Sequence, residues 1–152
     1  MKLHAVINIK NFEIINYSIT DDHGNDGRGG INIVKRVKNR IISLLGDKGY
    51  DSKAIYNELE DKVVIPPRRN ASTLSRGSPY RARIPRFMHR FKEGLWKMKN
   101  SYSLRWNVEI YFSRIKRLFG EVIRAVKVEN IKQEMMLKVY FYNEYNKLRE
   151  GY

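Results

Sequence analysis

Residues 101–120 read SYSLRWNVEIYFSRIKRLFG, and the spacing of their charged and aromatic side chains decides how the chain is interpreted. At about 100° per residue of an α-helix, Arg105, Glu109 and Lys116 lie within roughly 40° of one another, with Tyr102 beside them. One helical stripe therefore presents a carboxylate between an arginine, a lysine and a phenol. Such a stripe suits a carboxylate that binds a metal ion while its cationic neighbours bind phosphate oxygens. The alternative is a surface helix whose charges pair along its length.

The whole chain is strongly basic. Its 152 residues include 30 lysines and arginines against 16 aspartates and glutamates, which gives a formal net charge of +14. Such an excess indicates a polyanionic partner, and nucleic acid is the first candidate. A basic membrane-surface protein is the alternative, but the sequence contains no apolar run approaching roughly 18 residues. The absence of cysteine excludes disulfides and thiolate metal sites and fits a reducing cytoplasm.

Hydrophobic periodicity predicts one mixed α/β domain in which helices cover a small sheet. In the first expected strand, Leu3, Ala5 and Ile7 share one face, and His4 and Val6 share the other. Strands are expected at residues 2–9, 13–20, 43–45 and 62–65, and helices at 31–41, about 51–60, about 102–119 and about 129–148.

Two loop features complete this outline. Residues 21–30, DDHGNDGRGG, are dense in turn-forming side chains and are expected to be a loop. Asp51 or Ser52 is expected to cap the helix that follows.

The composition changes at about residues 68–100, which form a basic, partly irregular insert. Aromatic side chains alternate with the cations there, as they do in a loop or arm that lies along a nucleic-acid backbone. The alternative is a solvated basic linker whose aromatics dock on the body of the domain. Ten cations face the single acid Glu93: Arg68, Arg69, Arg76, Arg81, Arg83, Arg86, Arg90, Lys92, Lys97 and Lys99.

Asp47 directly follows a short apolar strand, so it is expected at the strand's carboxyl end, where ligands of α/β sheets commonly bind. If the fold brings Asp47 beside Glu109, the two carboxylates repel each other unless a divalent cation lies between them. Ligands that are all oxygen favour Mg²⁺ or Mn²⁺. A metal between two acids, with cations nearby, is equipment for phosphoryl transfer. Asp47 on its own is equally explained by a turn before Gly49.

Several motifs together resemble one family. The spacing of Tyr102, Arg105, Glu109 and Lys116 matches Y-x2-R-x3-E-x6-K, which resembles the signature of DDE transposases from bacterial and archaeal insertion sequences. Four further segments are similar to stretches of that family: KLHAVINI at the start, ITDDHGND after it, GDKGYDS (46–52) and VVIPPRRN (63–70). They occur in the same order as in the family. The resemblance spans nearly the whole chain.

The resemblance implies a ribonuclease H-like α/β fold, a mixed sheet flanked by helices, and metal-dependent cleavage and joining of transposon-end DNA in the cytoplasm, at the nucleoid. Asp47 and Glu109 would be the second and third catalytic acids and would bind Mg²⁺ or Mn²⁺. Arg105, Lys116 and Tyr102 would contact DNA phosphates, and the basic segment adds Arg68 and Arg69.

One part of the family pattern is not found in this sequence. The first catalytic aspartate would lie on a strand before Lys2, at the centre of the sheet, so the sheet is expected to be incomplete. The chain is then expected to be a C-terminal part of a transposase catalytic domain that is inactive alone. Its expected partner is an N-terminal transposase fragment or a second copy of the chain. Asp21, Asp22 and Asp26 could replace the first acid only by reaching the edge that carries Asp47, and turn formation is their expected role. The alternative function is a non-catalytic basic DNA-binding protein that modulates a full-length transposase.

Overall fold

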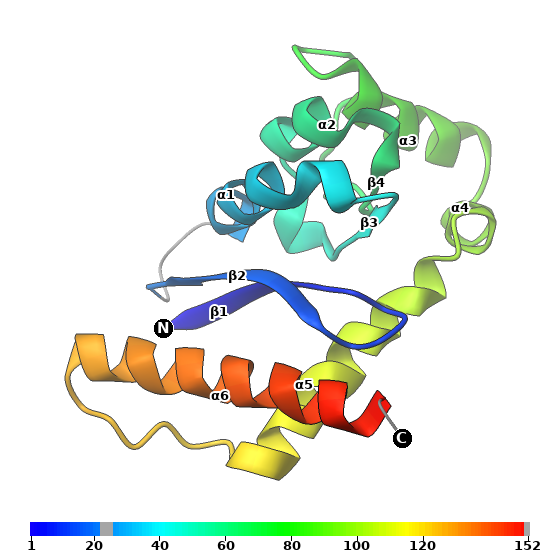
Figure 1. The fold of residues 1–152 in the computed structure, drawn as a ribbon. Helices are drawn as coiled ribbons and strands as arrows, with labels where there is room; N and C mark the ends of the chain where they lie inside the picture. Colours follow the sequence, from blue (N-terminus) through cyan, green and yellow to red (C-terminus); the bar gives the residue numbers. More distant parts are fainter. Residues whose placement is uncertain (22–25, 151–152) are drawn as a thin grey trace.

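The computed structural model describes residues 1–21 and 26–150, apart from the side chain of Glu150, and it is a mixed α/β protein (Figure 1). The strands are β1 (Lys2–Ile7), β2 (Ile14–Thr20), β3 (Leu44–Leu45) and β4 (Val63–Val64). The helices are α1 (Asp26–Val37), α2 (Lys53–Leu59), α3 (Pro79–Arg90), α4 (Glu93–Lys99), α5 (Trp106–Phe119) and α6 (Val128–Glu150).

The strands of the described residues form two sheets of two strands each, where one mixed sheet without its central strand was expected. β1 and β2 pair antiparallel as a hairpin, from Lys2 opposite Thr20 to Ile7 opposite Ile14. β3 and β4 pair parallel, with Leu44 opposite Val63. The sheets stay separate because β1 and β3 do not hydrogen-bond to each other. In Figure 1 the hairpin lies between α6 on one side and α1 on the other.

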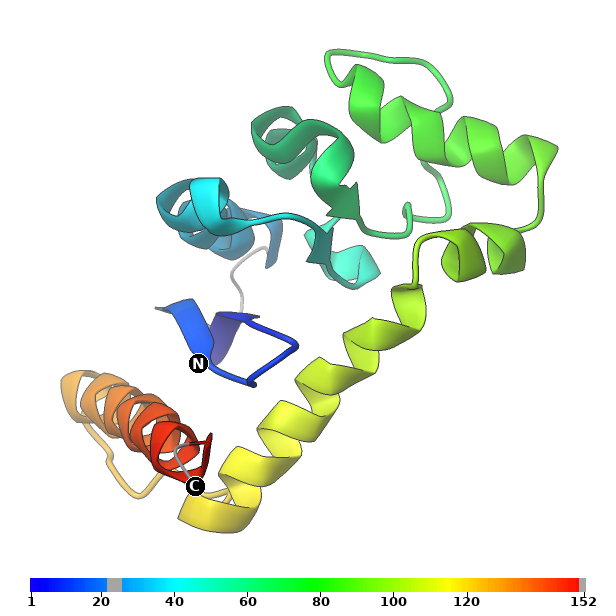
Figure 2. The ribbon, with the colours of Figure 1, turned by 45° about the vertical axis from the view of Figure 1, so that its right-hand side comes forward.

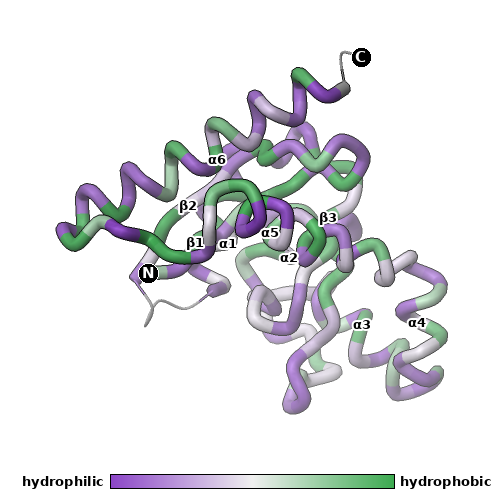
Figure 3. The backbone as a smooth tube through the Cα atoms, turned by 90° about the horizontal axis from the view of Figure 1, so that it is seen from below, coloured by the Kyte–Doolittle hydropathy of each residue, from purple (hydrophilic) through white to green (hydrophobic). Residues whose placement is uncertain are grey.

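Two hydrophobic clusters lie on the two sides of the hairpin. The first joins α1, α2 and β4 through buried residues that include Val34, Ile55 and Val64. The second joins β2, α5 and α6 through Ile14, Tyr111, Ile115, Val139 and Tyr142. The expected alternation of β1 is confirmed: Leu3, Ala5 and Ile7 pack on the second cluster and Val6 on the first. Figure 3 shows hydrophobic and hydrophilic residues alternating along α6, which covers the second cluster.

Helix α1 begins at Asp26, so the expectation of a loop through residue 30 is wrong for residues 26–30. The glycines there allow close packing, since a Cβ on Gly29 would lie 2.8 Å from Cδ2 of His4 and one on Gly30 2.7 Å from Cδ1 of Tyr50. Tertiary packing thus overrides the poor helix propensity of glycine. The expected turn residues Asp22 and His23 lie outside the described residues.

The basic segment is irregular only at 68–78, because α3 and α4 occupy most of the rest. Pro79 lies at the start of α3, where a missing N–H costs little, while Pro85 lies inside the helix. The insert is therefore partly irregular, as expected, and residues 79–90 and 93–99 are helices rather than an extended arm. At the start of α2, Ser52 is the capping residue, and its hydroxyl accepts from the amide of Ile55.

The expected helix at 102–119 is a regular α-helix only from Trp106, after a 3-10 turn at Tyr102–Arg105. Gly120, with φ of 76°, follows its end. Figure 2 shows α5 running from α4 past the strands towards the C-terminal end of α6. Among the described residues, no helix combines the length and the apolar character needed to cross a bilayer.

Candidate active site and nucleic-acid interface

Asp47 lies where the sequence predicted it, directly after β3. It is exposed, and its Oδ1 accepts a hydrogen bond of 2.8 Å from the amide of Gly49. This hydrogen bond forms the turn before Gly49, which was the alternative explanation for an aspartate at position 47. The turn uses Oδ1 for a backbone N–H, and the exposed carboxylate can still bind a ligand.

The beginning of the signature segment lies against the end of β3. The hydroxyl of Tyr102 donates a hydrogen bond of 3.0 Å to the carbonyl of Gly46, the residue before Asp47. Burial raises the pKa of Tyr102, which keeps the phenol protonated and able to donate. Two segments more than fifty residues apart are thus joined beside Asp47.

Arg105 contacts one of the two predicted acids and lines a cavity with the other. It lines the same cavity as Asp47, and its Nη2 donates to Oε1 of Glu109 at 2.7 Å. Glu109 is exposed and also lines a second, shallow cavity with Trp106, Ile110, Ser113, Arg114 and Arg117. Arg105 therefore contacts Glu109 and shares a cavity lining with Asp47. A cation shared by the two acids stays a prediction.

Lys116 lies two helical turns from Glu109, about 10 Å along the axis. Its Nζ pairs with Oε1 of Glu121 at 2.5 Å. The pair of Arg105 and Glu109 is the along-helix contact of the alternative interpretation, whereas Glu121, the partner of Lys116, lies beyond the end of α5. Exposed pairs contribute about 1 kcal/mol or less, so either cation can exchange its carboxylate for a phosphate.

Asp26 is a further acid at this edge, where turn formation was its expected role. A Cβ added to Gly49 would lie 2.8 Å from Oδ2 of Asp26 and 3.0 Å from Oδ1 of Asp47. The two carboxylates therefore flank the same point, and the absence of a side chain at residue 49 keeps it open. Oδ1 of Asp26 also lies 3.4 Å from Nζ of Lys2. The sequence hid this position because residue 26 fell within an expected loop.

Tyr50 and His4 form a buried polar contact next to these acids. Nδ1 of His4 lies 2.8 Å from the Tyr50 hydroxyl, and Nε2 lies 2.8 Å from the Thr20 hydroxyl. Burial, together with the negative charges of Asp47 and Asp26, raises the pKa of Tyr50 to about 12. Burial lowers the pKa of His4, although Asp26 opposes this shift. Both side chains are therefore neutral near pH 7.

Arg68 lies over the turn that carries Asp47. Its guanidinium donates to the carbonyls of Lys48 and Gly49 at 3.4 and 3.2 Å, while Arg69 is exposed. The predicted DNA contact of Arg68 thus adjoins the predicted acid, although its side chain is already partly used to hold the turn.

A buried ion pair supports the same region and was not predicted. The Asp51 carboxylate, which is fully buried, accepts from Nε and Nη2 of Arg81 at 2.6 and 2.7 Å. It also accepts from the backbone amide of Arg68 at 2.8 Å. Asp51 therefore ties α3 and residue 68 to the turn after β3, and its proposed helix-capping role is wrong. The sequence signal was ambiguous because aspartate is also a common capping residue.

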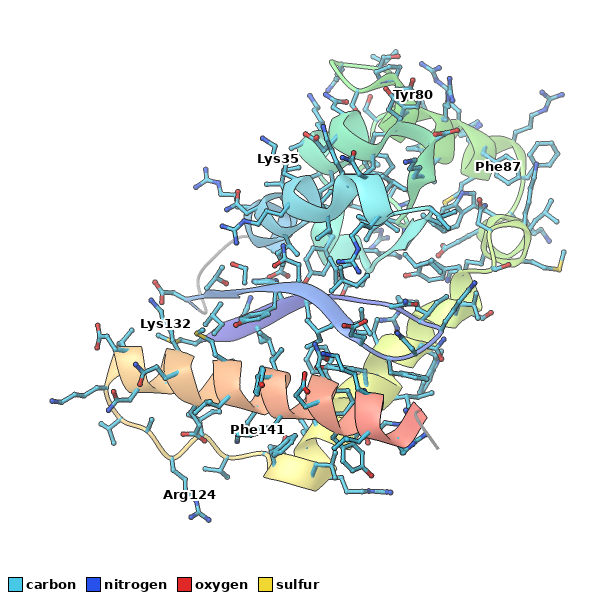
Figure 4. The ribbon with its side chains drawn as sticks, in the orientation of Figure 1. Lys35, Tyr80, Phe87, Arg124, Lys132 and Phe141 are labelled. Atoms are coloured by element: carbon cyan, nitrogen blue, oxygen red, sulfur yellow. The ribbon has the colours of Figure 1, made fainter. Side chains whose placement is uncertain are left out.

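The aromatics of the basic segment mostly dock on the body of the domain. Trp96 is buried, and Tyr80 and Phe87 pack against the first cluster. Figure 4 shows Tyr80 and Phe87 on the helices of this segment. Only Phe91 is exposed among the segment's aromatics. The aromatics therefore follow the alternative expectation, in which they dock on the body of the domain, while most of the cations remain on the surface.

No group of three or more potential metal-binding His, Asp or Glu side chains occurs in the part of the chain that the structure describes. Among the described acids, Asp26 and Asp47 flank the point beside Gly49, and Glu109 pairs with Arg105.

Comparison with known families identifies the class of protein that this arrangement belongs to. A family model described as "Transposase DDE domain" matches residues 1–143. The chain therefore belongs to the DDE transposase family, as the signature residues predicted. Proteins of this family act on DNA and generally use divalent metal ions. No solved structure matches the chain.

Proposed function

We propose that the chain is a C-terminal part of a DDE transposase catalytic domain, which binds transposon-end DNA in the cytoplasm, at the nucleoid. In the complete enzyme it contributes to metal-dependent strand cleavage and transfer. The observation that carries this proposal is the contact between Tyr102 and Gly46, because it brings the signature helix to the strand end that bears Asp47.

Asp47 and Glu109 would hold the Mg²⁺ or Mn²⁺ ion. The chemistry of the donor set fits, because the acids at this edge offer the oxygen ligands that these ions prefer. The open point beside Gly49, flanked by oxygens of Asp26 and Asp47, fits as well. When bound, the metal supplies Lewis acidity that activates water or a 3′-hydroxyl and stabilises the departing oxygen.

Asp26 is the nearest acid that could complete the ligand set. It reaches the edge that carries Asp47, which was the condition for it to replace the first catalytic aspartate. We propose that it adds a carboxylate to the site, while the family's first acid comes from an N-terminal transposase fragment. A second copy of the chain is the other candidate partner.

The cations around the acids would bind DNA. Arg105 and Arg68 adjoin Asp47, and Lys116 extends the positive charge along α5. Tyr102 would contact a phosphate while it holds the end of β3. Together with Arg69, these side chains would position the scissile phosphate by direct charge-assisted hydrogen bonds.

Cleavage of DNA that carries the transposon ends, with Mn²⁺ and a supplied N-terminal fragment, tests the proposal. We expect cleavage that is lost in Asp47→Asn and in Glu109→Gln, because each removes a metal ligand. Glu144→Gln on α6 is the matched control and should retain cleavage. Mn²⁺ binding to the chain alone, measured by electron paramagnetic resonance, should weaken in Asp47→Asn and Asp26→Asn. Unchanged cleavage in Asp47→Asn and Glu109→Gln would overturn the proposed roles.

The second candidate function is a non-catalytic DNA-binding protein that modulates a full-length transposase. The distribution of charge favours it, because cations lie on both sides of the molecule, as Lys35 and Arg124 illustrate in Figure 4. Salt-sensitive DNA binding without cleavage, even with the N-terminal fragment present, would support this function over the first.

A further inference from the structure

One buried side chain on β1 contacts the chain segments that carry the paired carboxylates. His4 is 3% exposed. Its Nδ1 lies 2.8 Å from the hydroxyl oxygen of Tyr50, and its Nε2 lies 2.8 Å from that of Thr20. Because each hydroxyl can donate or accept, both ring nitrogens are paired in either neutral tautomer. The two contacts therefore fix the orientation of the ring and use all of its polar atoms.

The contact with Tyr50 supports the turn that carries Asp47. Tyr50 ends the 3-10 turn Lys48–Tyr50, and Asp47 is the capping residue of that turn. The amide of Tyr50 donates to the carbonyl of Asp47 at 3.1 Å. The rings of His4 and Tyr50 also meet edge to face, with centroids 5.9 Å apart. The position of the Tyr50 side chain therefore determines where the backbone of Asp47 lies.

The same two rings pack against the first turns of α1, the helix that begins at Asp26. A Cβ on Gly29 would lie 2.8 Å from Cδ2 of His4, and one on Gly30 would lie 2.7 Å from Cδ1 of Tyr50. The backbone of α1 is thus in direct contact with both rings, without side chains between them. Because protein interiors are close-packed, a change in either ring alters the position of this end of the helix.

We propose that His4 is a positioning residue for the carboxylates of Asp26 and Asp47. It fixes Asp47 through Tyr50 and Asp26 through the first turns of α1, so that oxygens of both acids flank the open point beside Gly49. Such supporting groups orient metal ligands without touching the metal ion. The inference rests on the proposed function, because it takes the two carboxylates as part of the metal site.

Removal of the Tyr50 hydroxyl tests the positioning role. Tyr50→Phe keeps the ring against Gly30 and His4 and removes only the contact with Nδ1. We expect the affinity of the chain for Mn²⁺, measured by isothermal titration calorimetry, to fall by about tenfold or more. Thr20→Val removes the other hydroxyl at nearly constant shape, and it should weaken Mn²⁺ binding as well, because the His4 ring is then free to turn. Circular dichroism checks that both variants are folded.

A control variant separates positioning from a general loss of stability. Asn143→Ala on α6 removes two hydrogen bonds to the backbone of Ile14, on the side of the hairpin away from α1 (Figure 1). It should lower the midpoint of urea unfolding and leave the affinity for Mn²⁺ unchanged. A purely structural role of His4 predicts that Asn143→Ala and Tyr50→Phe have the same effect on Mn²⁺ binding.

Hydrogen exchange of the metal-free chain gives a second measurement, which does not depend on the metal site. In Tyr50→Phe, the amides of residues 30–33 and 49–51 should exchange about tenfold or more faster, while those of α6 keep their rates. Three results would overturn the inference: unchanged Mn²⁺ affinity in Tyr50→Phe, an equal loss of affinity in Asn143→Ala, or faster exchange spread evenly over the chain.

The two measurements distinguish failure of this inference from failure of the proposed function. A wild-type chain that binds no Mn²⁺ would contradict the proposed metal site, and the exchange rates would then decide alone whether His4 holds the two segments. Mn²⁺ binding that needs Asp26 and Asp47 but not the Tyr50 hydroxyl would keep the proposed function and reject the role of His4.

Discussion

The hydroxyl group of Tyr102 donates a 3.0 Å hydrogen bond to the backbone carbonyl of Gly46 and so joins the start of the signature helix to the end of β3. Trp96 supports this contact from α4, with its ring centroid 5.7 Å from that of Tyr102. The signature tyrosine therefore has a structural role beside Asp47, in addition to the proposed contact with DNA.

Replacement of Tyr102 by phenylalanine tests that structural role. Tyr102→Phe removes the hydroxyl and keeps the ring packing, so we expect the free energy of unfolding to fall by about 1 kcal/mol. Urea unfolding followed by circular dichroism measures the change. Tyr17→Phe is the control, because the Tyr17 hydroxyl makes no hydrogen bond within the described residues, and it should be nearly neutral. A Tyr102→Phe protein as stable as the wild type would show that the bond contributes nothing to the fold.

Gly49→Ala tests the open point between the two carboxylates. The new Cβ would meet oxygens of Asp26 and Asp47 and displace them, so Mn²⁺ binding should weaken by about tenfold or more. Stability should change little, because the displaced atoms are the ends of side chains. Isothermal titration calorimetry gives the affinity. Gly94→Ala, whose Cβ would meet open space, should bind Mn²⁺ as the wild type does. Unchanged affinity in Gly49→Ala would show that the metal binds elsewhere.

The sequence predicted the order of the elements well but did not predict how they are joined. The alternation of β1 was readable because successive residues of a strand point to opposite faces, and each face of β1 packs on its own cluster. The helical start at Asp26 was not readable, because glycines that pack against His4 and Tyr50 look like turn residues in sequence. Likewise, the separation of β1 from β3 is a tertiary arrangement, which no local pattern records.

The same limit applies to the candidate site. The spacing of Arg105 and Glu109 on one helix predicted their contact, since neighbours four residues apart meet. The convergence of Asp26 on Asp47 is a tertiary contact between α1 and the turn after β3, so no spacing could reveal it. The ion pair of Asp51 and Arg81 was hidden for the same reason.

Loss of the ion pair between Asp51 and Arg81 should strongly lower the free energy of unfolding. Arg81→Ala leaves the fully buried carboxylate of Asp51 with only the backbone amide of Arg68, and we expect a loss of about 3 kcal/mol or more in the free energy of unfolding. Arg81→Lys should restore part of this loss, because lysine keeps the charge but not the two-point geometry. Arg83→Ala, an exposed arginine on the same helix, should cost about 1 kcal/mol or less. Chemical denaturation compares the three. Equal losses in Arg81→Ala and Arg83→Ala would contradict a special role for the buried pair.

His4 should make the stability of the protein depend on pH. Burial lowers its pKa below the ordinary histidine value of 6.5 despite the nearby Asp26, with Lys2 adding to the shift. As the pH falls through about 6.5, the unfolded chain therefore binds a proton before the folded one does, and the free energy of unfolding decreases. The stabilisation is complete above that pH and is lost progressively as the pH falls towards the lowered pKa of the folded state.

The variant His4→Gln isolates this effect. It weakens the contacts with Tyr50 and Thr20, so the variant should be less stable at about pH 7.5, but it should lose less stability than the wild type between about pH 7.5 and 5.5. Unfolding in urea at both pH values gives the comparison. His89→Gln, which replaces an exposed histidine on α3, should behave as the wild type does. A loss between the two pH values as large in His4→Gln as in the wild type would assign the pH dependence to other groups.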